Sequence, residues 1–408
     1  MPAALTHRRR AFELTIASSL ALPELAPAPA TGAADVVVER GPVAERLDDG
    51  GSRVVLDDVT FEASPHRCLI RLPSGTRFLV EHGERITVDA RPGTSDQEVR
   101  AYVIGSCLGA VLHQRGLIVL HGSAIDTPGG AVLFVGDSGK GKSSIAAAFC
   151  ARGHRLISDD ICAVRLDASR RPVVLPAYPQ LKLCPDALPG LEGRGDVRSR
   201  DGDKHVVTID GDTVDEPRPI LAIIHLRTFH VDRVSMTRLP RAASVRVIAR
   251  HIYRKCFLPG LAIGMDHAAR VADLAAVTPV YRTIRPRQSP SLRELTDEIA
   301  GVLDAAGQTD PDDRVDALDL NSRLGRSRSA VSARVGDRLV MTQLDHEQYF
   351  ELDPVGVRVW ELLASPRTVA ELSAQLLDEY DVSRADCERD LRALLTALHT
   401  HQLIQAVP

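Results

Sequence analysis

The sequence predicts an α/β protein of several parts, with a phosphate-binding loop between a short strand and a helix. Residues 136–143 read GDSGKGKS and fit the P-loop pattern G-x-x-x-x-G-K-[ST] at every fixed position. The apolar run 131–135 before the loop is typical of a buried strand, and residues 143–150 after it favour a helix. Residues 326–408 predict a separate domain of three short strands and three helices.

The N-terminal part, residues 1–95, predicts a β-rich region. Its short apolar segments are broken by Gly, Pro and Asp, and none carries recognisable chemistry. Basic residues before the apolar stretch 11–22 are also found in signal peptides. However, Glu13 interrupts that stretch, and residues 12–16 alternate as a strand does. We therefore expect a cytoplasmic protein.

The overall composition excludes several classes of protein. Of 408 residues, 44% are hydrophobic and 25% are charged, which is typical of globular chains. The net charge of −4 provides no basic field for nucleic acid. The seven cysteines are odd in number and form no C-x-x-C pair, which indicates a reducing compartment without a zinc site. Because no apolar run approaches the roughly 20 residues of a membrane helix, we expect no membrane partner. A homo-oligomer remains open.

Residues 96–305 are expected to form the central domain. A helix is predicted over 96–114, with Ser95 as a possible cap. The continuous apolar run 220–227 predicts a buried strand, and a second helix is predicted over 244–257. Residues 190–204 are rich in Gly, Arg and Asp, so they predict either a flap over the site or a disordered loop.

A hairpin is predicted just before the glycine-rich loop. Residues 117–126 predict a strand, and the turn T-P-G-G follows. If Asp126 lies opposite Ala131, counting back along both strands places His121 opposite Gly136. This register predicts an imidazole beside the phosphate site.

The glycine-rich loop is expected to bind the phosphates of a nucleotide. Its glycines let the backbone turn so that successive N–H groups point at phosphate oxygens. Lys142 would reach the outer phosphates, and the Ser143 hydroxyl can ligate Mg²⁺. The following helix adds its positive N-terminal end. The residues expected to hold the nucleotide are Gly136, Asp137, Ser138, Gly139, Lys140, Gly141, Lys142, Ser143 and Ser144.

Two adjacent carboxylates follow the next predicted strand. Residues 154–158 predict that strand, which ends in Asp159 and Asp160. Such a pair suits phosphoryl transfer, because one carboxylate can hold Mg²⁺ while the other accepts the proton of an attacking hydroxyl. The residues themselves leave open which carboxylate takes which role.

These features together resemble the catalytic domain of HPr kinase/phosphorylase. The resembling segments are the His-Gly before the hairpin, GDSGKGKSS and ARGHRLISDD, with their spacing. The resemblance is strong over residues 115–165 and weaker over 96–310. It implies a P-loop domain closer to that of phosphoenolpyruvate carboxykinase than to that of the GTPases.

Carried over by position, the resemblance implies a role for each site residue. Lys142 would bind the phosphates of ATP, and Ser143 and Asp160 would lie by Mg²⁺. Asp159 would be the base toward a substrate serine, with His121 as its active-site partner.

The sequence departs from the HPr kinase pattern at two places. Ser144 stands where the family commonly has Glu after the loop serine, and no Glu-x-Arg-Gly signature is visible in 193–212. The usual N-terminal domain is also absent, so neither the carrier protein HPr as substrate nor phosphorylase activity is expected. Basic residues that could supply positive charge to phosphate or peptide are Arg165, Lys182, Arg198, Lys204, Arg250, Arg254 and Lys255.

The C-terminal part is expected to bind a peptide. Residues 306–325 lose apolar periodicity and predict a linker. The order YFELDPVGVRVWELL…RTVAELSAQLLDEYDV over 326–406 resembles PqqD, a small winged-helix-like domain that binds leader peptides of ribosomally made, modified peptides. That resemblance implies a leader added as a strand at an open sheet edge. Trp360 is either part of the groove or core. The expected peptide-binding residues are Tyr349, Phe350, Leu352, Val355 and Val359.

The two resemblances together predict a kinase that uses ATP and Mg²⁺. Its substrate would be a hydroxyl, expected to be serine, on a precursor peptide held by the C-terminal domain. An alternative is a nucleotide-binding scaffold that transfers nothing and delivers the peptide to another modifying enzyme. A small-molecule kinase is also open, and nothing in the sequence separates ATP from GTP.

Overall fold

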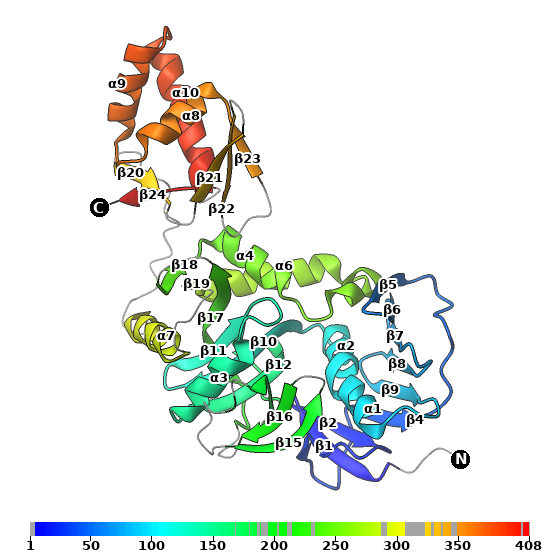
Figure 1. The fold of residues 1–408 in the computed structure, drawn as a ribbon. Helices are drawn as coiled ribbons and strands as arrows, with labels where there is room; N and C mark the ends of the chain where they lie inside the picture. The colour runs from blue at the N-terminus through cyan, green and yellow to red at the C-terminus, as the bar shows by residue number, and fades with distance from the viewer. Residues whose placement is uncertain are drawn as a thin grey trace. The chain divides into compact units, whose positions relative to one another are not determined.

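The chain divides into two compact units, Met1–Asp310 and Pro311–Pro408 (Figure 1). The finer division into four parts stays a prediction. The computed structural model describes residues 5–167, 169–178, 180–185, 188, 195–201, 204–209, 214–229, 233–286, 292–306, 323–327, 330–335, 338–343, 349–400 and 403–407.

The N-terminal region forms one sheet in the order β3-β1-β2-β4-β9-β8-β7-β6-β5. The predicted strand near residues 12–16 begins later, at Leu14, because Phe12 and Glu13 have φ of 55° and 61° and form the β1–β2 turn. Phe12 is nevertheless buried in the apolar core. The strands are β1 (His7–Ala11), β2 (Leu14–Ser18), β3 (Ala26–Pro27), β4 (Val36–Arg40), β5 (Ser52–Leu56), β6 (Val59–Ser64), β7 (Arg67–Arg71), β8 (Arg77–Glu81) and β9 (Arg85–Asp89).

The helix predicted over 96–114 is present, with a local change in its winding. It comprises α1 (Asp96–Tyr102), a π-helical turn η1 (Val103–Cys107) and α2 (Leu108–Gln114). Ser95 caps it as predicted, since its side chain accepts a hydrogen bond from the Glu98 amide. The apolar residues of this helix share one core cluster with the N-terminal sheet. The π-helical turn was not predicted, and such turns often lie at functional sites.

The second sheet holds the glycine-rich loop and has the order β11-β10-β12-β13-β17-β19-β18. Strand β11 also pairs with β17, so the strands from β11 to β17 close into a ring. The strands are β10 (Ile118–Thr127), β11 (Gly130–Val135), β12 (Arg155–Leu166), β13 (Pro172–Val174), β17 (Arg218–Phe229), β18 (Ser235–Arg238) and β19 (Val280–Pro286).

Helices cover this sheet through two further apolar clusters. These helices are α3 (Lys142–Ala151), α4 (Arg241–Arg250), α6 (Gly264–Val277) and α7 (Leu292–Ala306). The short helices η3 (Lys255–Phe257) and α5 (Leu258–Leu261) instead pack against β5 and β6 of the N-terminal sheet. The single helix predicted over 244–257 is wrong, because the backbone at His251 and Tyr253 hydrogen-bonds to β10 instead of continuing the helix. None of the described helices combines the length and apolar character needed to cross a membrane.

Part of the predicted flap is ordered as a hairpin. Strands β15 (Gly195–Asp201) and β16 (Lys204–Ile209) pair with β14 (Gln180–Leu183) in a three-stranded sheet. Residues 190–194 and 202–203 of the predicted flap lie outside the described residues.

The C-terminal unit has the predicted three strands and three helices. Trp360 is 3% exposed and belongs to the apolar core, so of the two predictions for this residue, groove or core, the core is confirmed. The strand pair β20–β24 was not predicted, and it shortens the predicted linker 306–325 because β20 begins at Arg323. The elements are β20 (Arg323–Arg326), β21 (Ala330–Val335), β22 (Arg338–Gln343), β23 (Tyr349–Leu352), α8 (Pro354–Leu362), α9 (Val369–Glu379), α10 (Arg384–Thr400) and β24 (Ile404–Val407).

Candidate active site

The glycine-rich loop connects the end of β11 to the start of α3. Gly139 and Gly141 have φ of 75° and 84°, which side chains other than glycine rarely adopt. The Nζ of Lys142 donates to the carbonyl oxygens of Gly136 at 2.9 Å and Asp137 at 3.2 Å, so the amine lies within the curve of the loop. No side chain caps α3, and Gly139 is exposed. The loop therefore presents a helix N-terminus and a lysine to an anion.

The hairpin before the loop has the predicted register. Asp126 lies opposite Ala131, and the ladder ends with Gly122 opposite Val135. His121 is thus the next residue beyond the pair that adjoins the loop. A Cβ on Gly122 would lie 2.7 Å from the Phe134 carbonyl oxygen, so the close pairing of the two strands requires glycine there.

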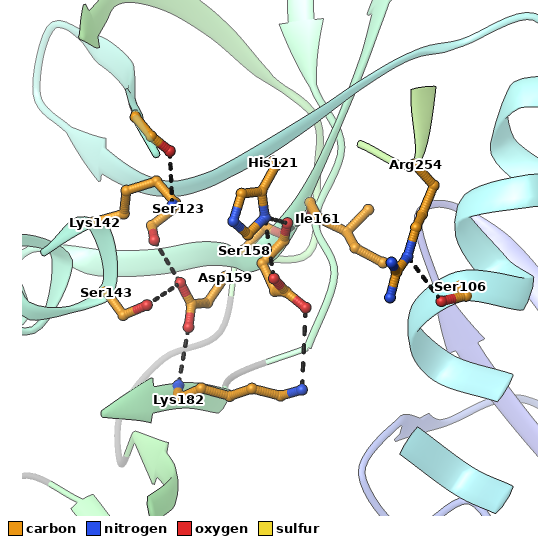
Figure 2. Close-up of polar contacts among 12 residues, drawn as sticks. Ser106, His121, Ser123, Lys142, Ser143, Ser158, Asp159, Ile161, Lys182 and Arg254 are labelled. Carbon is orange, nitrogen blue, oxygen red and sulfur yellow. Dashed lines mark hydrogen bonds and ion pairs between the residues drawn. The ribbon is translucent and has the colours of Figure 1, made fainter. Parts of the chain in front are cut away.

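Asp159 is buried and accepts hydrogen bonds from both sides. The hydroxyls of Ser123 and Ser143 donate to Oδ1, the latter at 2.9 Å, and the Lys182 amide donates to Oδ2 at 2.9 Å (Figure 2). Burial raises the pKa of Asp159 above its ordinary value, and the hydrogen bonds only partly offset that effect. Ser123 was missed by the sequence interpretation, although it follows the His-Gly pair directly.

Asp160 faces a different set of partners. Its Oδ1 lies 3.2 Å from Nδ1 of His121, and its Oδ2 lies 4.0 Å from Nζ of Lys182. Burial acts to raise the pKa of Asp160, but the His121 hydrogen bond and nearby positive charges hold it below its ordinary value. Asp160 also has φ of 70°, uncommon for a residue with a side chain. In a regular strand, the side chains of neighbouring residues point to opposite faces of the sheet. The kink at Asp160 instead lets the carboxylates of Asp159 and Asp160 lie in the same region of the site.

The structure groups the site residues differently from the sequence-based assignment. Ser143 contacts Asp159, whereas His121 contacts Asp160. The resemblance implied Ser143 with Asp160 at the metal and His121 beside Asp159. The backbone and side chain of Lys182 join the two groups, because its amide contacts Asp159 and its amine faces Asp160.

The candidate cations divide between those near the site and those away from it. Arg250 lies 3.5 Å from a carboxylate oxygen of Asp137 in the loop, whereas Arg165 pairs with Glu13. Lys255 is exposed. Arg285 was missed, yet it donates to the Lys140 carbonyl oxygen at 3.2 Å, and burial lowers its pKa. The side chains of Arg198 and Lys204 lie outside the described residues.

The oxygen donors beside the loop fit a magnesium ion. Mg²⁺ in nucleotide sites is held by one or two protein oxygens, with phosphate and water completing its shell. The hydroxyl of Ser143 and the carboxylate of Asp159 are such donors and lie in contact. The described residues contain no group of three or more His, Cys, Asp or Glu side chains that could hold a metal. Ser144, in place of Glu, provides no further carboxylate.

The predicted peptide-binding residues lie in two environments. Leu352 and Val359 are 8% and 1% exposed and pack in the core with Trp360, rather than on an open surface. Val355 is 41% exposed. Tyr349 and Phe350 lie on β23, which pairs with β22, and their side chains are outside the described residues.

Comparison with known proteins finds two families on the chain. Residues 116–175 match the HPr Serine kinase C-terminal domain, and residues 338–404 match PqqD, coenzyme PQQ synthesis protein D. The HPr kinase/phosphorylase of Limosilactobacillus reuteri is 33% identical over 155 residues, covering 37% of this chain and 45% of that relative. The curated relatives are covered over only 15% to 45% of their length.

Two solved structures are similar to separate parts of the chain. TbiB1 in complex with the TbiA(beta) leader peptide is 37% identical and covers 21% of this chain and 98% of its own, with a TM-score of 0.20. The Hpr(Ser) kinase/phosphatase from Coxiella burnetii is 13% identical and covers 45% of this chain and 95% of its own, with a TM-score of 0.24. The two family matches lie on different units of the fold. The chain therefore carries one segment that matches the HPr Serine kinase C-terminal domain and another that matches PqqD.

Proposed function

We propose that this protein is an ATP- and Mg²⁺-dependent kinase that phosphorylates a hydroxyl, expected to be serine, on a ribosomally made peptide. The observation that carries the proposal is the connected set of Ser143, Asp159, Lys182, Asp160 and His121 beside the glycine-rich loop. It lies on a chain that also has a PqqD-family domain.

The contacts support different roles for the carboxylates of Asp159 and Asp160. Ser143 and Asp159 would hold the metal, because they touch each other next to the loop. Mg²⁺ would supply positive charge to the phosphate oxygens. Asp160 is then the group that orients the acceptor hydroxyl and takes its proton. This exchanges the two roles that the family resemblance implied.

The transfer breaks one bond and forms another. The acceptor oxygen bonds to the γ-phosphorus, the bond from that phosphorus to the β,γ-bridging oxygen breaks, and ADP leaves. The acceptor proton passes to Asp160, whose lowered pKa keeps it ionised and ready at neutral pH. A weak base suffices, because a loose transition state keeps the proton on the acceptor until late. Lys142 would bind the outer phosphates from within the loop.

The C-terminal domain would hold the peptide's leader by β-augmentation. Tethering raises the local concentration of the acceptor, so the kinase domain need not recognise it tightly. Among the three members of the predicted set whose side chains are described, Val355 is exposed and is therefore available to a leader.

ADP release by the full chain, with peptides encoded beside the gene, tests this function. We expect release to depend on Mg²⁺, on an acceptor serine and on the leader. Nucleotide binding without release for every peptide would favour the scaffold alternative. Release that is indifferent to the leader would favour a small-molecule kinase.

A further inference from the structure

Arg254 follows a segment that is fixed against the active-site strand β10. The His121 amide donates to the His251 carbonyl oxygen at 2.8 Å, and the Tyr253 amide donates to the Val119 carbonyl oxygen at 2.8 Å. Arg254 comes next, with φ and ψ both 44°, a left-handed conformation that is uncommon for arginine. Backbone strain of this kind persists where the surroundings hold it, and it often lies at functional sites.

The helix that covers the N-terminal sheet makes room for this segment. A Cβ on Gly109 would lie 2.8 Å from the Tyr253 ring, so the ring can approach only because that residue is glycine. Ser106 lies in the π-helical turn η1 of the same helix and is 2% exposed. Its Oγ accepts a hydrogen bond from Nε of Arg254 at 3.1 Å. A residue of this helix therefore helps to hold the Arg254 side chain in place.

The guanidinium group of Arg254 is positioned without an acidic partner. It lies 4.9 Å from the ring centre of Phe61 and 5.6 Å from that of Tyr253, distances at which a cation is attracted to an aromatic ring. Within the described residues, no carboxylate comes within ion-pair distance of Arg254. Two aromatic rings and a serine therefore orient this arginine, and none of them carries a negative charge.

Figure 2 shows where this charge lies relative to the acidic pair. Lys142 and Ser143 approach Asp159 from one side, and Arg254 lies beyond His121 on the other. Arg254 is therefore not part of the nucleotide loop, which has Lys142, Arg250 and Arg285 around it.

We propose that Arg254 binds an oxyanion of the acceptor peptide, on the side of Asp160 away from the glycine-rich loop. The oxyanion is either a carboxylate of the peptide or the newly transferred phosphoryl group, since a guanidinium binds both in the same two-pronged way. This inference rests on the proposed function for the identity of the peptide as acceptor. The binding test below requires no turnover, so it can fail or succeed independently of the kinase activity.

The experiment compares R254M with the wild-type full chain, with Mg-ADP present. The matched control is R40M, because Arg40 is an exposed arginine of the same unit, paired with Asp96. Fluorescence anisotropy measures binding of three synthetic forms of the acceptor region, without its leader, of a peptide encoded beside the gene: one with serine, one with phosphoserine, and one with its acidic groups converted to amides. S106A, which removes the hydrogen bonds of Ser106 with Nε of Arg254 and with the Tyr253 side chain, is the second variant in case R254M folds poorly.

We expect R254M to weaken binding about 10- to 100-fold, S106A to weaken it less, and R40M to bind as wild type does. Weakening confined to the phosphoserine form identifies the phosphoryl group as the oxyanion. Equal weakening of the serine and phosphoserine forms, with none for the amide form, identifies a carboxylate. The proposal is overturned if R254M and S106A bind every form like the wild type. It is equally overturned if they lose ADP affinity by the same factor as peptide affinity.

Discussion

Ser143 at the start of α3 donates a hydrogen bond of 2.9 Å to Asp159 on β12. The hydroxyl that the loop pattern assigns to Mg²⁺ therefore already contacts a carboxylate. Asp159 is buried, and burial raises its pKa above the ordinary value despite its hydrogen bonds. A bound cation would compensate the charge of this carboxylate. This relationship leads to the first prediction.

Asp159→Asn should weaken the dependence of nucleotide binding on Mg²⁺. The substitution keeps the size of the side chain but removes the charge that would hold the ion. We expect the loss of transfer rate to be on the order of 100-fold. Titration of ATP with and without Mg²⁺ measures the effect. Asp160→Asn is the control, and it should leave the metal dependence intact; the reverse pattern would restore the assignment implied by the family resemblance.

His121→Ala should move the acidic limb of the transfer rate to higher pH. His121 contacts the Asp160 carboxylate, and its hydrogen bond helps to lower that pKa. Removing the bond raises the pKa, so protonation of Asp160 would begin to inhibit at a higher pH. The pH profile of kcat/KM measures this shift. An unchanged acidic limb, with the rate reduced equally at every pH, would show that His121 does not act through Asp160.

Substitutions of two valines in α8 should have different effects, one on stability and the other on leader binding. Val359→Ala should lower the free energy of unfolding of the C-terminal unit by about 2 kcal/mol, because the side chain is 1% exposed in the core. Val355→Ser should leave stability unchanged but weaken leader binding, because Val355 is exposed. Denaturant unfolding and peptide titration measure the two effects. If Val355→Ser leaves the affinity for the leader unchanged, this face of α8 is not part of the predicted groove.

Mild acid should destabilise the first unit through buried histidines. Burial lowers the pKa values of His113 and His251 to about 4, against an ordinary value of 6.5. Between these values the unfolded chain binds more protons than the folded one, so stability is full above pH 6.5 and falls as pH drops toward 4. We expect a loss on the order of 2 kcal/mol for each histidine. Urea unfolding at pH 7.5 and pH 5 measures it, and His113→Gln should reduce the difference.

The sequence predicted best where local pattern determines structure. The hairpin register around Asp126 and Ala131 follows from turn residues and strand alternation, so it could be counted from the sequence. The cap at Ser95 and the secondary structure of the C-terminal domain follow from equally local signals.

Contacts between distant segments could not be predicted in this way. The helix expected over 244–257 breaks because the backbone of His251 and Tyr253 pairs with β10, more than a hundred residues earlier in the chain. The kink at Asp160 and the contact of Arg254 with Ser106 likewise depend on the tertiary fold. The pattern D-D therefore predicted two neighbouring carboxylates but could not determine which of them faces the loop serine.

The intact mass of a candidate precursor peptide tests the central claim most directly. The full chain, ATP and Mg²⁺ are incubated with the peptide, and fragmentation then locates any added group. We predict a mass increase of one phosphoryl group on a hydroxyl residue, lost with Asp160→Asn. An unmodified peptide, under conditions where the chain binds both ATP and the leader, would contradict the kinase account.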